Sequence, residues 1–140
     1  LIRKHIKTYT PLFELKEYDC TFRRDGERDY QACSATVKLI VNGVEEYRVA
    51  EGDGPINALD AALRKALRPA YPYIDEMELE DYKVRIVDSH MGTAAKTRVL
   101  ILSSDHHSSW GTVGVSYNII EASWRALVDS VEYFLAKKRA

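Results

Sequence analysis

The chain has 140 residues, 46% hydrophobic and 29% charged, which is the composition of a single globular domain with one core. Its net charge of −1 argues against a nucleic-acid-binding module, because such modules gather basic residues on one face. No hydrophobic run approaches the roughly 20 residues of a membrane span, and the N-terminus lacks the pattern of a signal peptide. Cys20 and Cys33 lack Cys-x-x-Cys spacing and indicate reduced thiols in the cytosol, while one disulfide would also agree with their number.

The first half of the chain predicts three strands and then a helix. Residues 13–22 and 32–41 have the composition of strands, and Asn42-Gly43 predicts a tight turn into a third strand over residues 44–50. A helix is predicted from Pro55 to Arg68, because proline suits the first helical position and Pro69 stops the helix.

The second half predicts the same order of elements. Tyr82, Val84 and Ile86 alternate with charged residues as in a half-buried strand, and strands follow over residues 97–103 and 110–115. A helix is predicted over about residues 118–137. Its start is capped by Asn118 with Glu121 as a capping box, or else by Ser116 or Val115. Its apolar residues at helical spacing are Ile120, Trp124, Leu127, Val128, Val131, Phe134 and Leu135.

The two halves resemble each other in sequence. Asn57–Arg64 is similar to Asn118–Arg125, and Thr36–Val41 is similar to Thr97–Leu102, both at the same offset in numbering (118 − 57 = 61 and 97 − 36 = 61). This indicates a duplicated unit. We therefore predict an α+β fold of two pseudo-symmetric βββα units over residues 13–68 and 81–140, each an antiparallel sheet covered by a helix. Residues 69–80 would connect the units, and residues 1–12 would be a tail or a linker.

Few residues point to catalysis. The four histidines, His5, His90, His106 and His107, have no partner at helical i, i+4 spacing, so helical zinc motifs are absent. Nucleophile elbows, phosphate-binding loops and dinucleotide fingerprints are absent as well. The acidic run at residues 75–81 lacks the ligand order of an EF-hand loop and is expected to be solvated. The sequence predicts neither a catalytic nor a metal site.

One motif has the properties of a small-molecule site. Gly52 and Gly54 precede the first predicted helix, where backbone amides are free and carry partial positive charge. Glycines let that backbone approach a carboxylate closely. Asp53 could accept from an ammonium group, and Ile56 could cover an aliphatic tail. The same pattern is also typical of a plain turn before a helix.

Gly52–Leu63 resembles the motif that opens the first helix of the regulatory domain of 2-isopropylmalate synthases and their relatives. Residues 79–86, 92–101 and 110–129 are similar to the same family, and the last two segments resemble its citramalate synthase branch. The resemblance covers roughly residues 13–135. It implies two βββα units per chain, a homodimer with the effector near the interface, and an upstream TIM barrel joined through residues 1–12.

The resemblance implies the regulatory domain of (R)-citramalate synthase, a cytoplasmic protein in which isoleucine exerts feedback inhibition. The barrel would be an acyltransferase that condenses acetyl-CoA with a 2-oxo acid and uses a divalent metal, whereas this domain would need no cofactor. One alternative is the 2-isopropylmalate synthase domain with leucine as effector. Another is a dimerisation module without effector. Asp53 stands where the related motif often has Asn, which leaves the identity of the effector open.

The resemblance also implies effector contacts, position by position. They lie before and in the first helix, in and after the strand that opens the second unit, and before the second helix. Apolar members of the set also fit plain core positions. The set is Asp53, Ile56, Asn57, Leu79, Tyr82, Ile86, Thr93, Ala95, Val115 and Tyr117, with the backbone at Gly52 and Gly54.

Overall fold

The first sheet has three antiparallel strands and is followed by one helix. In this computed structural model, which describes residues 13–25, 30–87 and 96–139, sheet A has the order β1-β2-β3, with β1 at Glu14–Asp25, β2 at Tyr30–Val41 and β3 at Val44–Gly52. Helix α1 spans Pro55–Leu67. Asn42 and Gly43 have φ values of 52° and 80°, which is the geometry of the predicted hairpin turn.

The second sheet repeats this arrangement. A 3₁₀ helix, η2, spans Pro72–Glu76 and leads into β4 at Glu78–Ile86. Strands β5 at Thr97–Ser104 and β6 at Ser109–Ser116 complete sheet B, in the order β4-β5-β6, and α2 spans Ile119–Arg139. The predicted α+β fold of two βββα units is confirmed. Strand β4 begins four residues before Tyr82, inside the segment predicted to connect the units.

The offset between the two units differs from the one predicted. Lys38 pairs with Glu17 in sheet A, and Leu102 pairs with Asp81 in sheet B, so the sheets correspond at a different spacing (102 − 38 = 64 and 81 − 17 = 64). A bulge interrupts β1 and β4 at positions separated by this same offset. The predicted offset of 61 was therefore wrong. The error matters because a shift of three residues exchanges the inner and outer faces of a strand.

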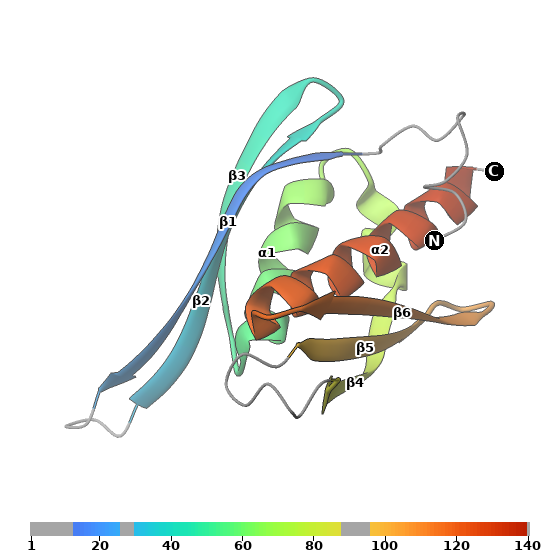
Figure 1. The fold of residues 1–140 in the computed structure, drawn as a ribbon. Helices are drawn as coiled ribbons and strands as arrows, with labels where there is room; N and C mark the ends of the chain where they lie inside the picture. Colours follow the sequence, from blue (N-terminus) through green and yellow to red (C-terminus); the bar gives the residue numbers. More distant parts are fainter. Residues whose placement is uncertain (1–12, 26–29, 88–95, 140) are drawn as a thin grey trace.

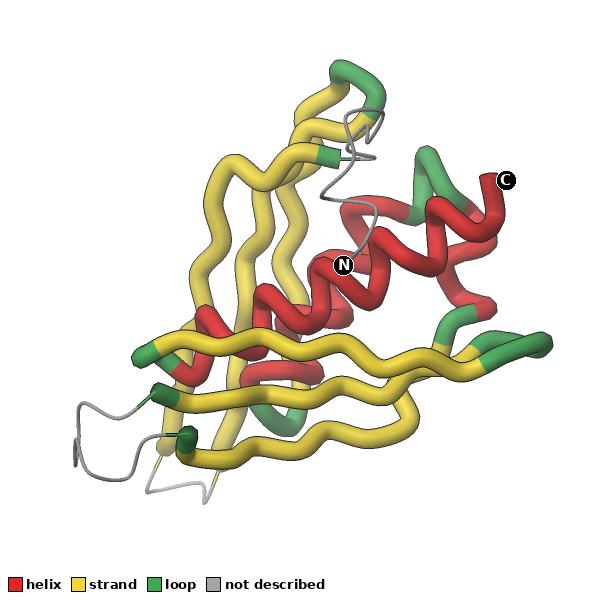
Figure 2. Tube along the Cα trace, turned by 45° about the vertical axis from the view of Figure 1, so that its right-hand side comes forward, coloured by secondary structure: helices red, strands yellow, loops and turns green. Residues whose placement is uncertain are grey.

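Both helices lie between the two sheets, as Figures 1 and 2 show. Helix α1 packs on β2 and β3, and α2 packs on β5 and β6. Inward side chains of the strands and both helices form one continuous core. The stripe predicted for α2 faces this core: Trp124, Leu127, Val131, Phe134 and Leu135 are buried, and Ile120 and Val128 are half-buried.

The segment between the units contributes to the core. Ile74 and Met77 are fully buried. Arg64 donates to the Ile74 carbonyl oxygen at 3.2 Å, and Arg68 forms an ion pair with Asp75 at 3.0 Å. The acidic run is therefore only partly solvated, because Met77 within it anchors the chain between η2 and β4.

Candidate functional site

The two helices begin at the same end of the molecule, next to the end of β6 (Figures 1 and 2). Gly54 and Asn118 are equivalent positions at these two starts, since they are related by the offset of the sheets (118 − 54 = 64). The side-chain oxygen of Asn118 accepts hydrogen bonds from the amides of Ile120 and Glu121, at 2.8 and 3.2 Å. This settles the cap of α2, which is Asn118. Helix α1 has glycine at the same position and no side-chain cap.

The start of α1 is therefore open. Pro55 is its first residue, and the amides of Ile56 and Asn57 have no acceptor within the helix. A Cβ atom built on Gly54 would meet no atom within 4 Å. Two amides without an acceptor in the helix, at its positive end and next to the open space beside Gly54, are suited to a carboxylate.

The second glycine of the motif has a structural role instead. A Cβ atom on Gly52 would lie 2.6 Å from the amide nitrogen of Ala58 and 2.9 Å from the Cβ atom of Asn57. The first turn of α1 thus fills the space that a side chain at Gly52 would need. Packing thus explains why position 52 has no side chain, while the ligand-binding role expected of both glycines stays a prediction.

An apolar strip on β4 is left uncovered. Tyr82 and Val84 pair with Ile101 and Val99, which are fully buried beneath α2, so all four face the helices. Nevertheless Tyr82 is 37% exposed, Val84 43% and Ile86 62%. The reason is that α2 covers β5 and β6 and leaves the edge strand beyond it open. This strip runs along β4 toward the end of the molecule where the helices begin.

The structure brings part of the expected effector set together. Asp53 and Asn57 are exposed at the start of α1, whereas the Ile56 side chain is 8% exposed and belongs to the core. What Ile56 offers to a ligand is its amide. Leu79 stands at the opposite end of β4 from Ile86, about 20 Å along the strand. Thr93 and Ala95 lie outside the described residues.

Val115 and Ile86 lie on opposite faces of sheet B. Ile86 belongs to the inner face, while Val115 pairs with the exposed Arg98 and faces outward. Tyr117 follows the end of β6 and is 62% exposed. A small ligand on the inner strip of β4 cannot also touch the outer face of its own sheet. Ile86 and Val115 therefore cannot contact one small ligand within a single chain.

Comparison with known sequences identifies the family. The sequence model of the LeuA allosteric (dimerisation) domain matches residues 1–135. The chain belongs to this family. The LeuA domain described above is thus the regulatory domain that the sequence motifs resemble, and it has the two units expected from that resemblance.

The relatives of this LeuA domain are longer enzymes. The (R)-citramalate synthase of Aquifex aeolicus is 49% identical over 137 residues, which cover 98% of this chain and 26% of that enzyme. The (R)-citramalate synthase of Geobacter sulfurreducens is 46% identical with the same coverage. The 2-isopropylmalate synthase of Aquifex aeolicus is 32% identical over 105 residues, 75% of this chain and 19% of that enzyme. The chain spans about a quarter of the length of the citramalate synthases that it matches.

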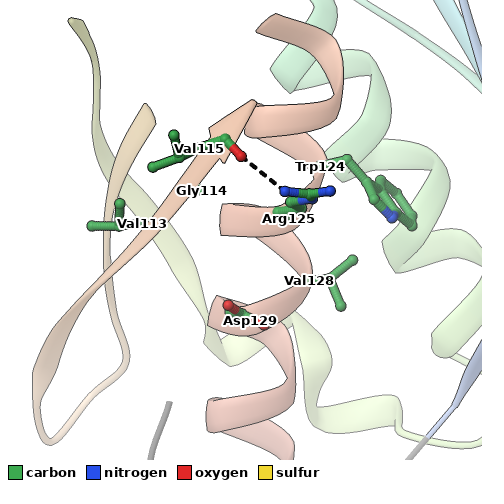
Figure 3. Close-up of a pocket in the computed structure, with 7 residues that line it drawn as sticks. All are labelled: Val113, Gly114, Val115, Trp124, Arg125, Val128 and Asp129. Atoms are coloured by element: carbon green, nitrogen blue, oxygen red, sulfur yellow. Dashed lines mark hydrogen bonds between the residues drawn. The ribbon is translucent and has the colours of Figure 1, made fainter. Parts of the chain in front are cut away.

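A groove between β6 and α2 was not anticipated from the sequence. It has a volume of about 480 Å³, and the Arg125 guanidinium in it donates to the Val115 carbonyl oxygen at 2.8 Å (Figure 3). Arg125 also pairs with Glu121 one helical turn earlier. Figure 3 shows Val113 and Val115 pointing away from α2. The groove has no signal in the sequence, since it depends on how β6 lies against the helix.

Both cysteines of the LeuA domain are free thiols. Cys33 is buried, and burial raises the pKa of Cys20, with nearby Cys33 adding to the effect. The described residues include no cluster of three or more His, Cys, Asp or Glu side chains that could hold a metal ion. No helix in the described part of the chain is long and apolar enough to cross a membrane.

Proposed function

We propose that this LeuA domain is the regulatory domain of an (R)-citramalate synthase and binds isoleucine as a feedback inhibitor. The observation that carries the proposal is the open start of α1, which lies at the end of the molecule toward which the uncovered apolar strip of β4 runs. Its counterpart at α2 is closed by the Asn118 side chain. The domain thus has one helix start with a side-chain cap and one without, and the uncapped start supports the proposal.

Each part of a free amino acid finds a counterpart there. The carboxylate would accept from the amides of Ile56 and Asn57, where the helix dipole favours negative charge. Asp53 is exposed next to them and would accept from the ammonium group. The inner strip of β4, with Tyr82 and Ile86, would cover the aliphatic side chain.

A second copy of the chain would complete the site. Val115 lies on the outer face of sheet B and therefore cannot contact a ligand at the start of α1 in its own chain. In this proposal it contacts the ligand that is bound by the partner chain. The family description includes dimerisation, which fits a homodimer with two such sites. Inhibition further requires that isoleucine bind two states of the linked enzyme with different affinity.

The catalytic part of the proposed protein lies outside this chain. It would be a barrel that condenses acetyl-CoA with a 2-oxo acid in the cytoplasm, with a divalent metal. The choice of isoleucine over leucine follows the relatives, because citramalate synthases are 46 and 49% identical and a 2-isopropylmalate synthase is 32% identical.

Calorimetric titration of the 140-residue chain with isoleucine, leucine, valine and aspartate tests the proposal. We expect isoleucine to bind most tightly and aspartate not to bind. A preference for leucine would assign the chain to the 2-isopropylmalate synthase branch. A folded protein that binds none of the four would be a dimerisation module without effector.

A further inference from the structure

Two tyrosines occupy equivalent positions in the two units, and both contact α2. Tyr18 on β1 and Tyr82 on β4 are related by the offset of the sheets (82 − 18 = 64). The Tyr18 ring stacks on the Trp124 ring, with centroids 4.7 Å apart. The Tyr82 ring is 37% exposed, and its hydroxyl oxygen lies 3.0 Å from the hydroxyl oxygen of Ser123. One tyrosine is thus held over the face of its ring, and the other is held at its tip.

Ser123 is a polar residue at a core position. It is 1% exposed, and the equivalent position of α1 holds Leu59, which is fully buried (123 − 59 = 64). A buried hydroxyl costs free energy unless it has a hydrogen-bond partner, which the Tyr82 hydroxyl supplies. Packing alone would favour an apolar side chain at this position, as in α1. The serine therefore indicates a role in holding Tyr82 rather than in filling the core.

The Tyr82 ring crosses the open edge of sheet B. Helix α2 packs on β5 and β6 and leaves β4 beyond it, so the hydrogen bond to Ser123 joins the edge strand to the helix. Val84 and Ile86 follow Tyr82 on the same face of β4, toward the end where the helices begin. The ring is therefore a wall across the apolar strip. Its direction decides how much of the strip, about 13 Å from Tyr82 to Ile86, is open to an aliphatic group.

We propose that Ser123 is a positioning residue of the effector site, which fixes the Tyr82 ring so that the strip fits the side chain of isoleucine. Since the site is that of the proposed function, the role of Ser123 rests on that proposal. Without the hydrogen bond, the partly exposed ring can turn about its side-chain bonds, and ligand binding then includes the cost of ordering it. A wall in a fixed place also distinguishes isoleucine from leucine, because their branches lie at different depths.

Calorimetric titration of the 140-residue chain with isoleucine and leucine tests this role with a matched pair of serines. Ser123→Ala removes the hydroxyl that contacts Tyr82. Ser130→Ala removes a fully buried hydroxyl of the same helix, which bonds Ser103 and accepts from the Trp110 indole at 3.1 Å. We expect Ser123→Ala to raise the dissociation constant of isoleucine about 5-fold, the effect of one hydrogen bond, and to reduce the preference over leucine. Ser130→Ala should leave both unchanged, and melting curves check that both variants are folded.

Tyr82→Phe removes the other hydroxyl of the pair and completes a double-mutant cycle. Because the two hydroxyls act through one hydrogen bond, the doubly substituted chain should bind isoleucine as weakly as either single variant, whereas a general loosening gives additive losses. Ser123 has no positioning role if Ser123→Ala binds isoleucine like the unchanged chain, if Ser130→Ala weakens binding equally, or if the losses add.

NMR signals of the Tyr82 ring in the ligand-free chain separate the role of Ser123 from the proposed function. Ser123→Ala should shift these signals, and Ser130→Ala should leave them in place. A Tyr82 ring that does not respond to Ser123→Ala would overturn the positioning role even if isoleucine binds. Shifted ring signals together with no isoleucine binding by the unchanged chain would contradict the proposed function, and with it the role of Ser123 in the effector site.

Discussion

At the scale of single residues, the two glycines before α1 have different environments. Gly54 faces open space in an extended conformation that any residue adopts, with φ at −149°, whereas Gly52 contacts the first turn of the helix. We predict that Gly54→Val weakens isoleucine binding at least about 10-fold with little loss of stability, because its side chain enters the ligand space. Gly52→Val is the matched control and should lose roughly 1–3 kcal/mol of unfolding free energy through overpacking. Calorimetry and chemical denaturation measure the two effects. Equal loss of binding and stability in Gly54→Val would refute the assignment.

Trp124 joins the two units through a ring contact. Its ring stacks on Tyr18 of β1 with centroids 4.7 Å apart, and it is only 5% exposed. Burial, and then the charge of Glu121, raise the pKa of Tyr18. We predict that Trp124→Ala lowers the free energy of unfolding by roughly 3–5 kcal/mol. Tyr133→Ala on the same helix is the control and should lower the free energy of unfolding less, because Tyr133 is 40% exposed. A loss below about 1 kcal/mol for Trp124→Ala would mean that the buried face of α2 is assigned wrongly.

At the scale of elements, one carboxylate ties the β5–β6 hairpin to the end of α2. Asp105 accepts from the amides of His107 and Ser108, at 2.7 and 2.8 Å, and forms an ion pair with Lys137 at 2.7 Å. The Lys137 side chain, and then the His107 amide, hold the pKa of Asp105 well below its ordinary value. A carboxylate with a depressed pKa stabilises the fold above the pKa of the unfolded chain, about 3.9, and loses this effect as the pH falls further.

We therefore predict a steeper acid destabilisation in the unchanged protein than in Asp105→Asn. Asparagine keeps an oxygen for the two amides but cannot titrate. Urea unfolding between pH 6 and pH 2.5 should show the two curves converging as the pH falls below about 4. Parallel curves would mean that Asp105 contributes no charge-dependent stability.

Much of the element pattern could be predicted from the sequence, since it rests on local chemistry. The Asn42-Gly43 turn and the apolar stripe of α2 are local signals, and both are confirmed. The start of β4 was missed because Glu78, Glu80 and Asp81 are exposed residues of an edge strand, so their charges have no cost there. The predicted repeat offset was wrong because it relied on a few identical residues. The pairing register of the strands, which gives the correct offset, is visible only in the folded sheets.

The candidate site was less predictable than the elements. Its motif was visible in the sequence. The different environments of Gly52 and Gly54, however, depend on how closely β3 approaches α1. That Ile86 and Val115 are on opposite faces of one sheet likewise follows from strand pairing. Both facts come from tertiary packing, for which a single sequence carries no local signal.

At the scale of the whole molecule, the helices lie between two sheets and begin at one end (Figures 1 and 2). The proposed effector site lies at this end. Strand β1 contacts α2 through the stacked rings of Tyr18 and Trp124. In the proposed function, residues 1–12 are the linker between β1 and the catalytic region. A ligand that changes how α1 and α2 sit between the sheets would thus act on the strand nearest to that region.

Amide chemical shifts of the isotope-labelled chain, followed by NMR during titration with isoleucine, test the central claim most directly. We predict the largest changes at the amides of Ile56 and Asn57, because these groups would donate to the ligand carboxylate, with further changes at Tyr82 and Ile86. Amides near Asp105 should not move. Changes confined to other parts of the molecule, or none at saturating isoleucine, would contradict this prediction.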